Sequence, residues 1–511
     1  MGKLLSEYKK SQYDNLVLSI SSNNDQYYGF ASNPIPQGNG IYTNLTGDAY
    51  TTQFVSDWNL IFGKRISNND VYPIINLNTW ISNTVYNRYD NTQDLSNSVF
   101  YVVTPPLTAG GFYNIFKCID NNNNSPSTSI PNQVQGTSFT IPADGYTWRY
   151  ITSISENDYY TYGTKTYIPV YPNNSIVSAA SNNAGIDVVA LVSGGNGYNS
   201  YTSGIITSGN STVIQLASNS SINNDFYTKN GIFLYNTFTS NPGVFTITKY
   251  VSNSSGNWAY LDNPANTSLL YPTLTNYIIS PRVVFNTDGT TDPIAYSTIN
   301  TVSNSIASIV MLETGSNITW ANVTIQSNTY FGSGANVYAI APPPGGHGFD
   351  PASELNMQGI VINFIFNNNE SNTILTDMTY NKIGLIKNPY ACYANGAKST
   401  SRYSNTTFSA VVELSYTIGN QLPVGRQVQG QTSGARGTVF FSNSSVAYLV
   451  GDINFVNETV STDDGQYSIQ AIVNTNGNIY TKDIRPLYVQ NLYDVARSNV
   501  QSESYKLIIQ V

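Results

Sequence analysis

The chain is predicted to be mainly β with minor α, on the basis of its composition, its turn residues and its short apolar runs. Its 511 residues include 40 Tyr and 20 Phe, and aromatic side chains favour strands. Asn, Ser and Gly are abundant and favour turns. Charged residues make up only 10% of the chain, and aromatic residues make up 13%. Because disordered chains are poor in aromatic residues, this polar sequence is expected to fold.

The clearest strand pair is expected on the two sides of an asparagine-rich turn. Residues 115–119 and 146–154 are short apolar runs that alternate as half-buried strands do. Residues 121–126, NNNNSP, form a dense turn signal. Asp144 and Gly145 then turn the chain directly into the second strand. The stretch is interpreted as a packed β framework without the residue types of a catalytic site.

Two helices are predicted from their patterns. Residues 1–14 place apolar side chains on one side of a short amphipathic helix. Residues 155–162 form the second helix, in which Ser155 is an N-cap and Asp158 holds the capping-box position three residues later.

A further helix and a strand pair are expected near the N-terminus. Residues 16–20 and 27–31 are apolar runs joined by a polar turn, which predicts two paired strands. Lys64 and Arg65 would end the helix, where cations suit its dipole. The apolar residues at helical spacing before them are Phe54, Trp58, Ile61 and Phe62.

The middle of the chain is predicted to be a β insertion. Residues 176–345 are rich in Gly, Ser, Thr and Asn, with short β-branched runs. Residues 188–207 and 308–327 each consist of an apolar run, a Gly turn and a second apolar run, which predicts two copies of one β-hairpin module. The expected division is residues 1–175, the insertion, and residues 346–511, which complete the core.

Charge and cysteine content exclude several function classes. The net charge is −8 and the pI is about 4.7, whereas nucleic-acid binding requires a basic face. No run of about 18 apolar residues predicts a membrane helix, and the N-terminus lacks the apolar core of a signal peptide. Cys118 and Cys392 are too far apart in sequence for a disulfide framework, so both are expected to be reduced thiols.

Catalytic and metal-binding patterns are scarce. His347 is the one histidine, so a two-histidine zinc motif is excluded. A Ser-His-Asp site would need His347 and Asp350, but no G-x-S-x-G elbow accompanies them. The imidazole is expected instead to bond to the backbone of its glycine-rich loop. Carboxylates for glycoside hydrolysis could still meet in space, with Glu313, Asp350 and Glu354 as candidates. The prediction is a protein that is not an enzyme, with no catalytic, cofactor-binding or metal-binding residues.

Several ordered blocks carry a family resemblance. They are residues 58–66 (WNLIFGKRI), 116–128 (FKCIDNNNNSPST), 144–150 (DGYTWRY), 345–355 (GGHGFDPASEL) and 383–389 (IGLIKNP). In this order they resemble the gene-8 baseplate wedge proteins of T-even-like contractile-tailed phages, in the long form found in cyanophages. The second and third blocks are the closest to the family's Y-K-C-L-x-N-N-x-G-x-P-S-T and D-G-Y-x-W-K-Y.

The C-terminal block resembles the family with departures. The matching residues are Tyr488, Asn491, Gln501 and Glu503. Gln490, Leu492 and Val500 stand where the family has Glu, Arg and Asp, which puts in doubt any salt bridge that the family makes there. Residues 176–341 are poorly matched.

The resemblance implies a non-enzymatic structural protein of the virion, located in the tail baseplate and assembled in the host cytoplasm. It implies a homodimer in each wedge, large contacts with other wedge proteins, and rearrangement when the tail contracts. It also implies a discontinuous α/β sandwich core built from both chain ends, with inserted β-barrel or β-sandwich domains. The insertion is available for a fibre contact. No nucleic acid, membrane or cofactor is expected as a partner.

Two other functions remain open. One is a receptor-binding tail protein that recognises host glycan through aromatic clefts, usually as a trimer. The other is a polysaccharide-degrading enzyme, which would use the three carboxylates Glu313, Asp350 and Glu354.

Overall fold

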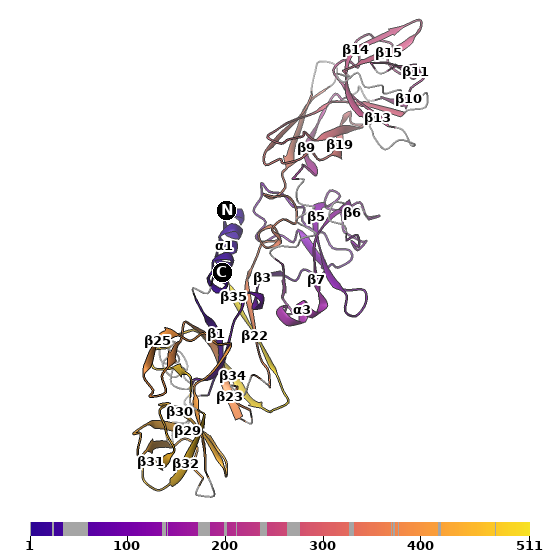
Figure 1. Ribbon diagram of the computed structural model, residues 1–511. Coiled ribbons are helices and arrows are strands. Elements are labelled where there is room, and N and C mark those ends of the chain that lie inside the picture. Colours follow the sequence, from indigo (N-terminus) through magenta and orange to yellow (C-terminus); the bar gives the residue numbers. More distant parts are fainter. Residues whose placement is uncertain are drawn as a thin grey trace. The chain divides into compact units, whose positions relative to one another are not determined.

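The computed structural model shows a mainly β protein with a few helices (Figure 1). It describes residues 2–22, 25–33, 60–134, 139–140, 142–171, 184–198, 202–210, 212–235, 243–262, 276–326, 332–368, 370, 374–376, 378–416, 421–475 and 477–510. The chain forms two compact units. Unit 1 is Met1–Tyr8 with Ile75–Met357, and unit 2 is Lys9–Ile74 with Gln358–Val511. The predicted β-rich class with minor α is confirmed.

Unit 2 contains a sheet that draws strands from both parts of the chain. Its order is β26-β2-β1-β23-β34, and the strands are β1 (Tyr27–Ser32), β2 (Leu60–Arg65), β23 (Met378–Lys387), β26 (Thr407–Ser409) and β34 (Pro486–Arg497). The central strand β1 pairs antiparallel with β2 and with β23. All six residues of β1 are buried. Strands distant in sequence therefore share one core, as expected for a core built from both chain ends.

Two predictions near the N-terminus are wrong. Residues 16–20 are not a strand but belong to helix α1 (Gly2–Ser21). Tyr13 and Ile20 are buried side chains of this helix, and their separation of seven residues corresponds to about two helical turns. Ile61 and Phe62 lie in strand β2 instead of a helix, because β2 pairs on both edges and buries a continuous apolar run. Phe54 and Trp58 lie outside the described residues.

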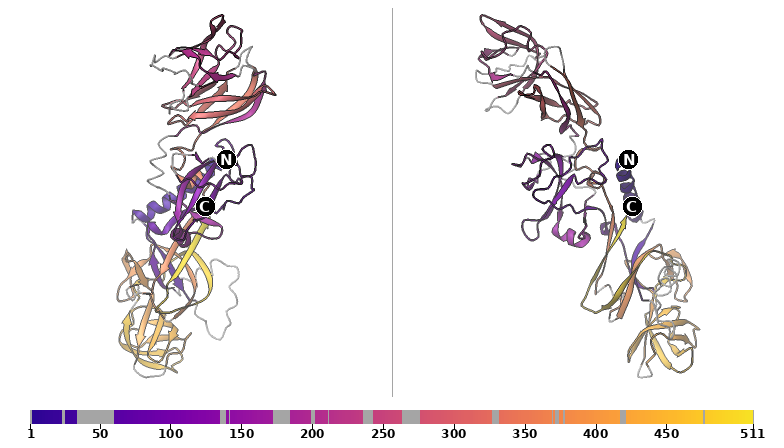
Figure 2. Two further views of the ribbon diagram at one scale, coloured as in Figure 1. Left: turned by 90° about the vertical axis from the view of Figure 1, so that its right-hand side faces the viewer. Right: turned by 180° about the vertical axis from the view of Figure 1, so that it is seen from behind.

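A second sheet of unit 2 brings the last strand onto an internal one. Three of its strands are β3 (Val71–Asn76), which follows the short helix η1 (Asn68–Asp70), β22 (Gly359–Phe366) and β35 (Glu503–Gln510). β22 pairs antiparallel with both neighbours. The two views in Figure 2 show the yellow strand β35 beside β22. The strand β35 therefore joins this core through its pairing with β22.

Unit 2 also contains a closed barrel with the order β27-β30-β29-β28-β31-β32. Its strands are β27 (Val411–Ser415), β28 (Gln427–Gly430), β29 (Arg436–Ser442), β30 (Val446–Gly451), β31 (Glu458–Thr462) and β32 (Ser468–Thr475). The barrel core includes Leu414, Val439 and Leu449. Closure leaves no strand edge unpaired. A small sheet accompanies the barrel, formed by β24 (Tyr390–Cys392), β25 (Lys398–Arg402) and β33 (Ile479–Tyr480).

In unit 1 the predicted strand pair forms as expected. The sheet order is β4-β5-β7-β6, with β4 (Tyr101–Thr104), β5 (Phe112–Asp120), β6 (Phe139–Thr140) and β7 (Thr147–Ser155). β5 and β7 pair antiparallel, with Lys117 opposite Arg149. Asn122, Asn123 and Asn124 all have positive φ angles, a conformation that asparagine tolerates better than most residues. The predicted turn is therefore confirmed.

The helix after β7 is the predicted one. α3 (Glu156–Tyr162) begins after Ser155, whose hydroxyl accepts a hydrogen bond from the Asp158 backbone amide. The two atoms are 3.0 Å apart. Strand β8 (Tyr167–Pro169) follows.

Ser155→Ala is expected to lower the free energy of unfolding by about 1 kcal/mol, because the Asp158 amide loses its acceptor. Ser155→Asn is the matched control, since asparagine caps as well as serine. Urea unfolding of both variants, with hydrogen exchange at residues 156–162, measures the effect. Equal stability of the two variants would show that the cap contributes nothing.

The insertion forms strands where they were predicted but pairs them differently. One sheet has the order β10-β16-β13-β14-β15-β12-β11, and three two-stranded pairs are β21-β9, β18-β19 and β17-β20. The strands are β9 (Val188–Asn196), β10 (Thr202–Ile205), β11 (Ser208–Gly209), β12 (Val213–Leu216), β13 (Gly231–Tyr235), β14 (Gly243–Asn253), β15 (Gly256–Leu261), β16 (Asn276–Ser280), β17 (Val283–Thr287), β18 (Ile294–Asn300), β19 (Ser305–Glu313), β20 (Ala321–Ile325) and β21 (Ser333–Ile340).

The two predicted hairpin modules are wrong. β9 pairs with β21 and β10 with β16, so residues 188–207 do not fold back on themselves. β19 pairs with β18 and β20 with β17. The Gly-turn segments therefore connect different sheets. Alternating apolar residues mark a strand, but they do not select its partner.

Within the described residues, no helix combines the length and the apolar character needed to cross a membrane.

Candidate functional site

Five ionisable side chains meet in the interior of unit 1, and we call them the buried ion cluster. They are Lys117 on β5, Arg149 on β7, Asp187 just before β9, His347 in a glycine-rich loop, and Glu354 in the short helix α5 (Pro351–Glu354). Their side chains are 0% to 9% exposed. Charged groups are almost never buried to this extent unless they are paired.

The contacts of the cluster form one chain. The Lys117 ammonium bonds to both Glu354 Oε1 and His347 Nδ1. His347 Nε2 lies 2.8 Å from Asp187 Oδ2. Arg149 also holds Asp187, with Nη1 3.2 Å from the same Oδ2 and 3.3 Å from Oδ1. Two cations, Lys117 and Arg149, thus face two carboxylates, so their four formal charges balance.

Backbone and aromatic groups complete the cluster. The Gly348 amide donates to Glu354 Oε2 at 2.5 Å. The Lys117 ammonium lies 3.9 Å from the centroid of the Tyr89 ring, within cation–π range. The same ring meets His347 edge-to-face at 5.7 Å between centroids. Each charged group therefore has a partner that offsets part of its lost hydration.

Burial and pairing shift the pKa values in opposing ways. Burial lowers the pKa of Lys117 to about 8, although the Glu354 carboxylate opposes the shift. Burial alone would raise the pKa of Glu354, but Lys117 and then His347 outweigh it and lower the pKa to about 2. Burial is likewise outweighed at Asp187, whose pKa is lowered by His347 and Arg149. At neutral pH both carboxylates are therefore ionised.

Acid is expected to destabilise unit 1 through these carboxylates. The Glu354 pKa falls from 4.5 to about 2 on folding, so its ionised form stabilises the fold above pH 4.5. That contribution is lost progressively as pH falls from about 4.5 towards 2. Urea unfolding at a series of pH values should show this slope. Glu354→Gln should flatten it, whereas Glu313→Gln, at an exposed position on β19, should leave it unchanged; equal slopes in all three proteins would contradict the assignment.

The sequence-derived candidates fall in different settings. The expectation that His347 bonds to its loop backbone is wrong, because the ring lies between Asp187 and Glu354. Asp350 caps α5, accepting from the Ser353 amide at 3.3 Å. Glu313 ends β19, and its residue is exposed. The His347 ring contacts Asp187, Glu354 and Lys117. These contacts do not form a Ser-His-Asp arrangement with Asp350.

Sequence reasoning missed Lys117, Arg149 and Asp187. The available signal was a basic residue within each of two apolar strands, FKC and WRY. Such a residue either points to solvent or requires a buried anion. Here Phe116, Lys117 and Cys118 are all buried, because β5 is covered on both faces. Asp187 carries no local signal, since its sequence neighbours are ordinary strand residues.

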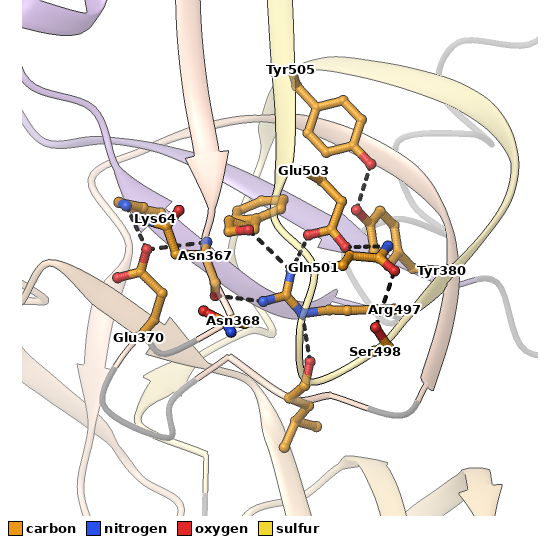
Figure 3. A network of polar contacts seen from close by, with 12 residues as sticks. Lys64, Asn367, Asn368, Glu370, Tyr380, Arg497, Ser498, Gln501, Glu503 and Tyr505 are labelled. Atoms are coloured by element: carbon orange, nitrogen blue, oxygen red, sulfur yellow. Dashed lines mark hydrogen bonds and ion pairs between the residues drawn. The ribbon is translucent and has the colours of Figure 1, made fainter.

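Unit 2 has a second polar network, centred on Arg497 (Figure 3). Its guanidinium donates to the carbonyl oxygens of Leu375 at 2.9 Å, Phe366 at 3.3 Å and Asn367 at 2.5 Å. It also forms an ion pair with Glu503. The side chain of Arg497 is 0% exposed. One arginine thus joins the end of β34 to the end of β22 and to the start of β35.

Two residues of the C-terminal block support Glu503 and its surroundings. Gln501 Nε2 donates to Glu503 Oε1 at 2.8 Å and to the Ala496 carbonyl at 2.9 Å. Tyr380 and Tyr505 join hydroxyl groups at 2.5 Å in the same region (Figure 3). Gln501 and Glu503 are among the residues that match the family resemblance. The block therefore contains a buried salt bridge, between Arg497 and Glu503.

Neither network resembles a metal centre or a proton-transfer site. No group of three or more His, Cys, Asp or Glu residues is placed to hold a metal ion in the described parts of the chain. Cys118 and Cys392 are free thiols. Glu354 has a depressed pKa and is held by Lys117 and Gly348, so it is poorly suited to give a proton to a substrate. The arrangement joins chain segments through charge.

Neither the models of known protein families nor the curated proteins gave a match to this chain.

Proposed function

We propose that the protein is a structural subunit of the baseplate wedge in a contractile phage tail and not an enzyme. The observation that carries the proposal is where the family-like blocks lie. Lys117, Arg149, His347 and Glu354 come from three of the blocks that resemble the family, residues 116–128, 144–150 and 345–355, and all four belong to the buried ion cluster. Lys117, His347 and Glu354 match the family pattern, and Arg149 stands where the family has Lys, so the resembling residues form internal contacts.

The buried ion cluster suits a subunit that must bear mechanical load. Breaking a buried ion pair by removing one partner costs about 3–5 kcal/mol, because an uncompensated charge remains. The buried ion cluster ties β5 and β7 to both ends of the insertion, through Asp187 on one side and His347 on the other. Such a joint transmits force between segments without opening. This supports a role in holding neighbours as the tail contracts.

The surface offers area for neighbouring subunits. β34 pairs with β23 and lies at the edge of its sheet. Leu487, Tyr488 and Tyr493 on this strand are exposed, and Tyr493 is 97% exposed. Edge strands and exposed tyrosines are common in protein–protein contacts. They support contacts with a second copy and with other wedge proteins.

The position of the chain in a virion map tests the proposal. Two copies in each wedge at the tail tip are expected. Copies found only at fibre ends would contradict it and favour a receptor-binding protein. Light scattering that gave a trimer, together with retention on host polysaccharide, would point the same way. Release of reducing ends from that polysaccharide would instead establish an enzyme.

A further inference from the structure

A cavity of about 270 Å³ lies in unit 1, beside the buried ion cluster. Its walls come from two segments, residues 89–100 and 342–356, with Glu7 at the margin. The volume is many times that of one water, about 30 Å³. It is at the lower end for small-molecule pockets, which are typically about 300–1,000 Å³. The cavity therefore suits one large side chain better than an oligosaccharide.

The first wall is fixed by hydrogen bonds to the second wall and to the residues just before it. Tyr338 donates its hydroxyl to Asp90 at 2.5 Å, and the Ala341 amide donates to Asn91 at 3.1 Å. The Asn356 side chain donates to the Ser96 carbonyl at 3.2 Å. The cavity is thus part of the folded framework.

The lining is aromatic and apolar. It includes Tyr89, Leu95, Phe100, Phe349 and residues 342–344, which are three prolines. Phe349 is 51% exposed, although its ring packs against the loop. A Cβ added at Gly345 would lie 2.5 Å from that ring, so the glycine permits Phe349 to sit there. An aromatic side chain is therefore held partly open to solvent at the cavity wall.

The charge of the lining has one sign. Its ionisable carboxylates are Glu7, Asp90, Asp350 and Glu354, and no Lys, Arg or His lines the described walls. Glu354 is paired with Lys117 behind the wall. Asp90 and Asp350 are held by neutral donors, among them Thr92 and Ser353. Such donors fix the carboxylates without cancelling their charge.

We propose that this cavity receives a basic side chain, arginine before lysine, from an apolar segment of a neighbouring polypeptide. The guanidinium would lie near Asp350 and against the exposed ring of Phe349, where cation–π and ionic attraction act together. Arginine is enriched at interface centres because its planar group both stacks and pairs. An anion or a nucleic acid would be repelled. The inference rests on the proposed function, since it assigns one contact of the subunit.

Benzamidine tests the proposal with the purified protein, because it unites an aromatic ring and a planar cation. Benzamide is its neutral isostere. Ligand-observed NMR or calorimetry should show that benzamidine binds with an affinity in about the millimolar range or tighter. Benzamide should bind more weakly. Equal binding of the two compounds, or no binding of benzamidine, would overturn the proposal. The experiment needs no virion, so its failure is distinct from failure of the proposed function.

Two variants locate the binding. Asp350→Asn keeps the helix cap, because asparagine caps as well as aspartate, and should weaken benzamidine about fivefold. Asp225→Asn is the matched control, since Asp225 also accepts a hydrogen bond from a hydroxyl group three residues later, that of Thr228, but does not line the cavity. Phe349→Ala removes the exposed ring and should also weaken binding. Unchanged binding in both cavity variants, with folding verified by circular dichroism, would place benzamidine elsewhere and overturn the assignment.

Discussion

Lys117→Met is expected to lower the free energy of unfolding of unit 1 by about 3–5 kcal/mol. The substitution leaves the Glu354 carboxyl group, whose side chain is 1% exposed, buried without its ammonium partner, and it also removes the ammonium from His347 and from the Tyr89 ring. Urea unfolding followed by tryptophan fluorescence reports on this unit. Four of the five tryptophans, Trp80, Trp148, Trp258 and Trp320, belong to it.

The same substitution at an exposed site provides the control. Lys249 lies in unit 1, at an exposed position on β14, so Lys249→Met should change stability by less than about 0.5 kcal/mol. The double variant Lys117→Met with Glu354→Met should recover part of the loss, because no unpaired charge then remains. A Lys117→Met protein as stable as Lys249→Met would show that the buried ion cluster does not stabilise the fold.

Arg497→Met should destabilise unit 2 by a similar amount, about 3–5 kcal/mol. The variant leaves Glu503 buried without its cation and removes donors from the carbonyl groups of Phe366 and Leu375. Buried acceptors without donors cost about 1–3 kcal/mol each. Hydrogen exchange at β22 and β35 should report the loss directly, since the network lies at the ends of these strands.

Two other substitutions separate charge from geometry. Arg497→Lys keeps the charge but not the planar fork, so it should lie between the wild type and Arg497→Met. Arg426→Met alters an ion pair with Asp464 whose arginine is 47% exposed, and it should cost less than about 1 kcal/mol. If Arg497→Lys were as stable as the wild type, the fork geometry would be irrelevant to the network.

Some elements could be predicted because their signals are local. The asparagines of residues 122–124 adopt positive φ, and the Ser155 hydroxyl bonds to an amide three residues away. Each of these features depends only on residues that lie within a few positions of one another in the sequence. The strands around them followed from alternation, which is likewise local. In contrast, residues 60–63 are a short apolar run, and such a run does not distinguish a helix from a central strand.

The candidate site could be predicted only in part. Lys117 and Arg149 interrupt apolar strands, so the sequence held a sign that buried anions were needed. It could not show that Asp187 and Glu354 supply them, since both lie far along the chain. The same limit explains the hairpin error, because β9 finds its partner in β21 and not in β10.

By itself the sequence determined the β-rich class, the asparagine turn, the capped helix and the strand content of the insertion. All of these depend on residues that are close in the chain, where side-chain size, hydrogen bonding and backbone preference act directly. Tertiary structure alone decided which strands pair, which carboxylates meet Lys117 and Arg149, and how residues 89–100 and 342–356 enclose a cavity. The physical reason is that burial and charge pairing are satisfied by neighbours in space, and one local pattern is compatible with many such neighbours.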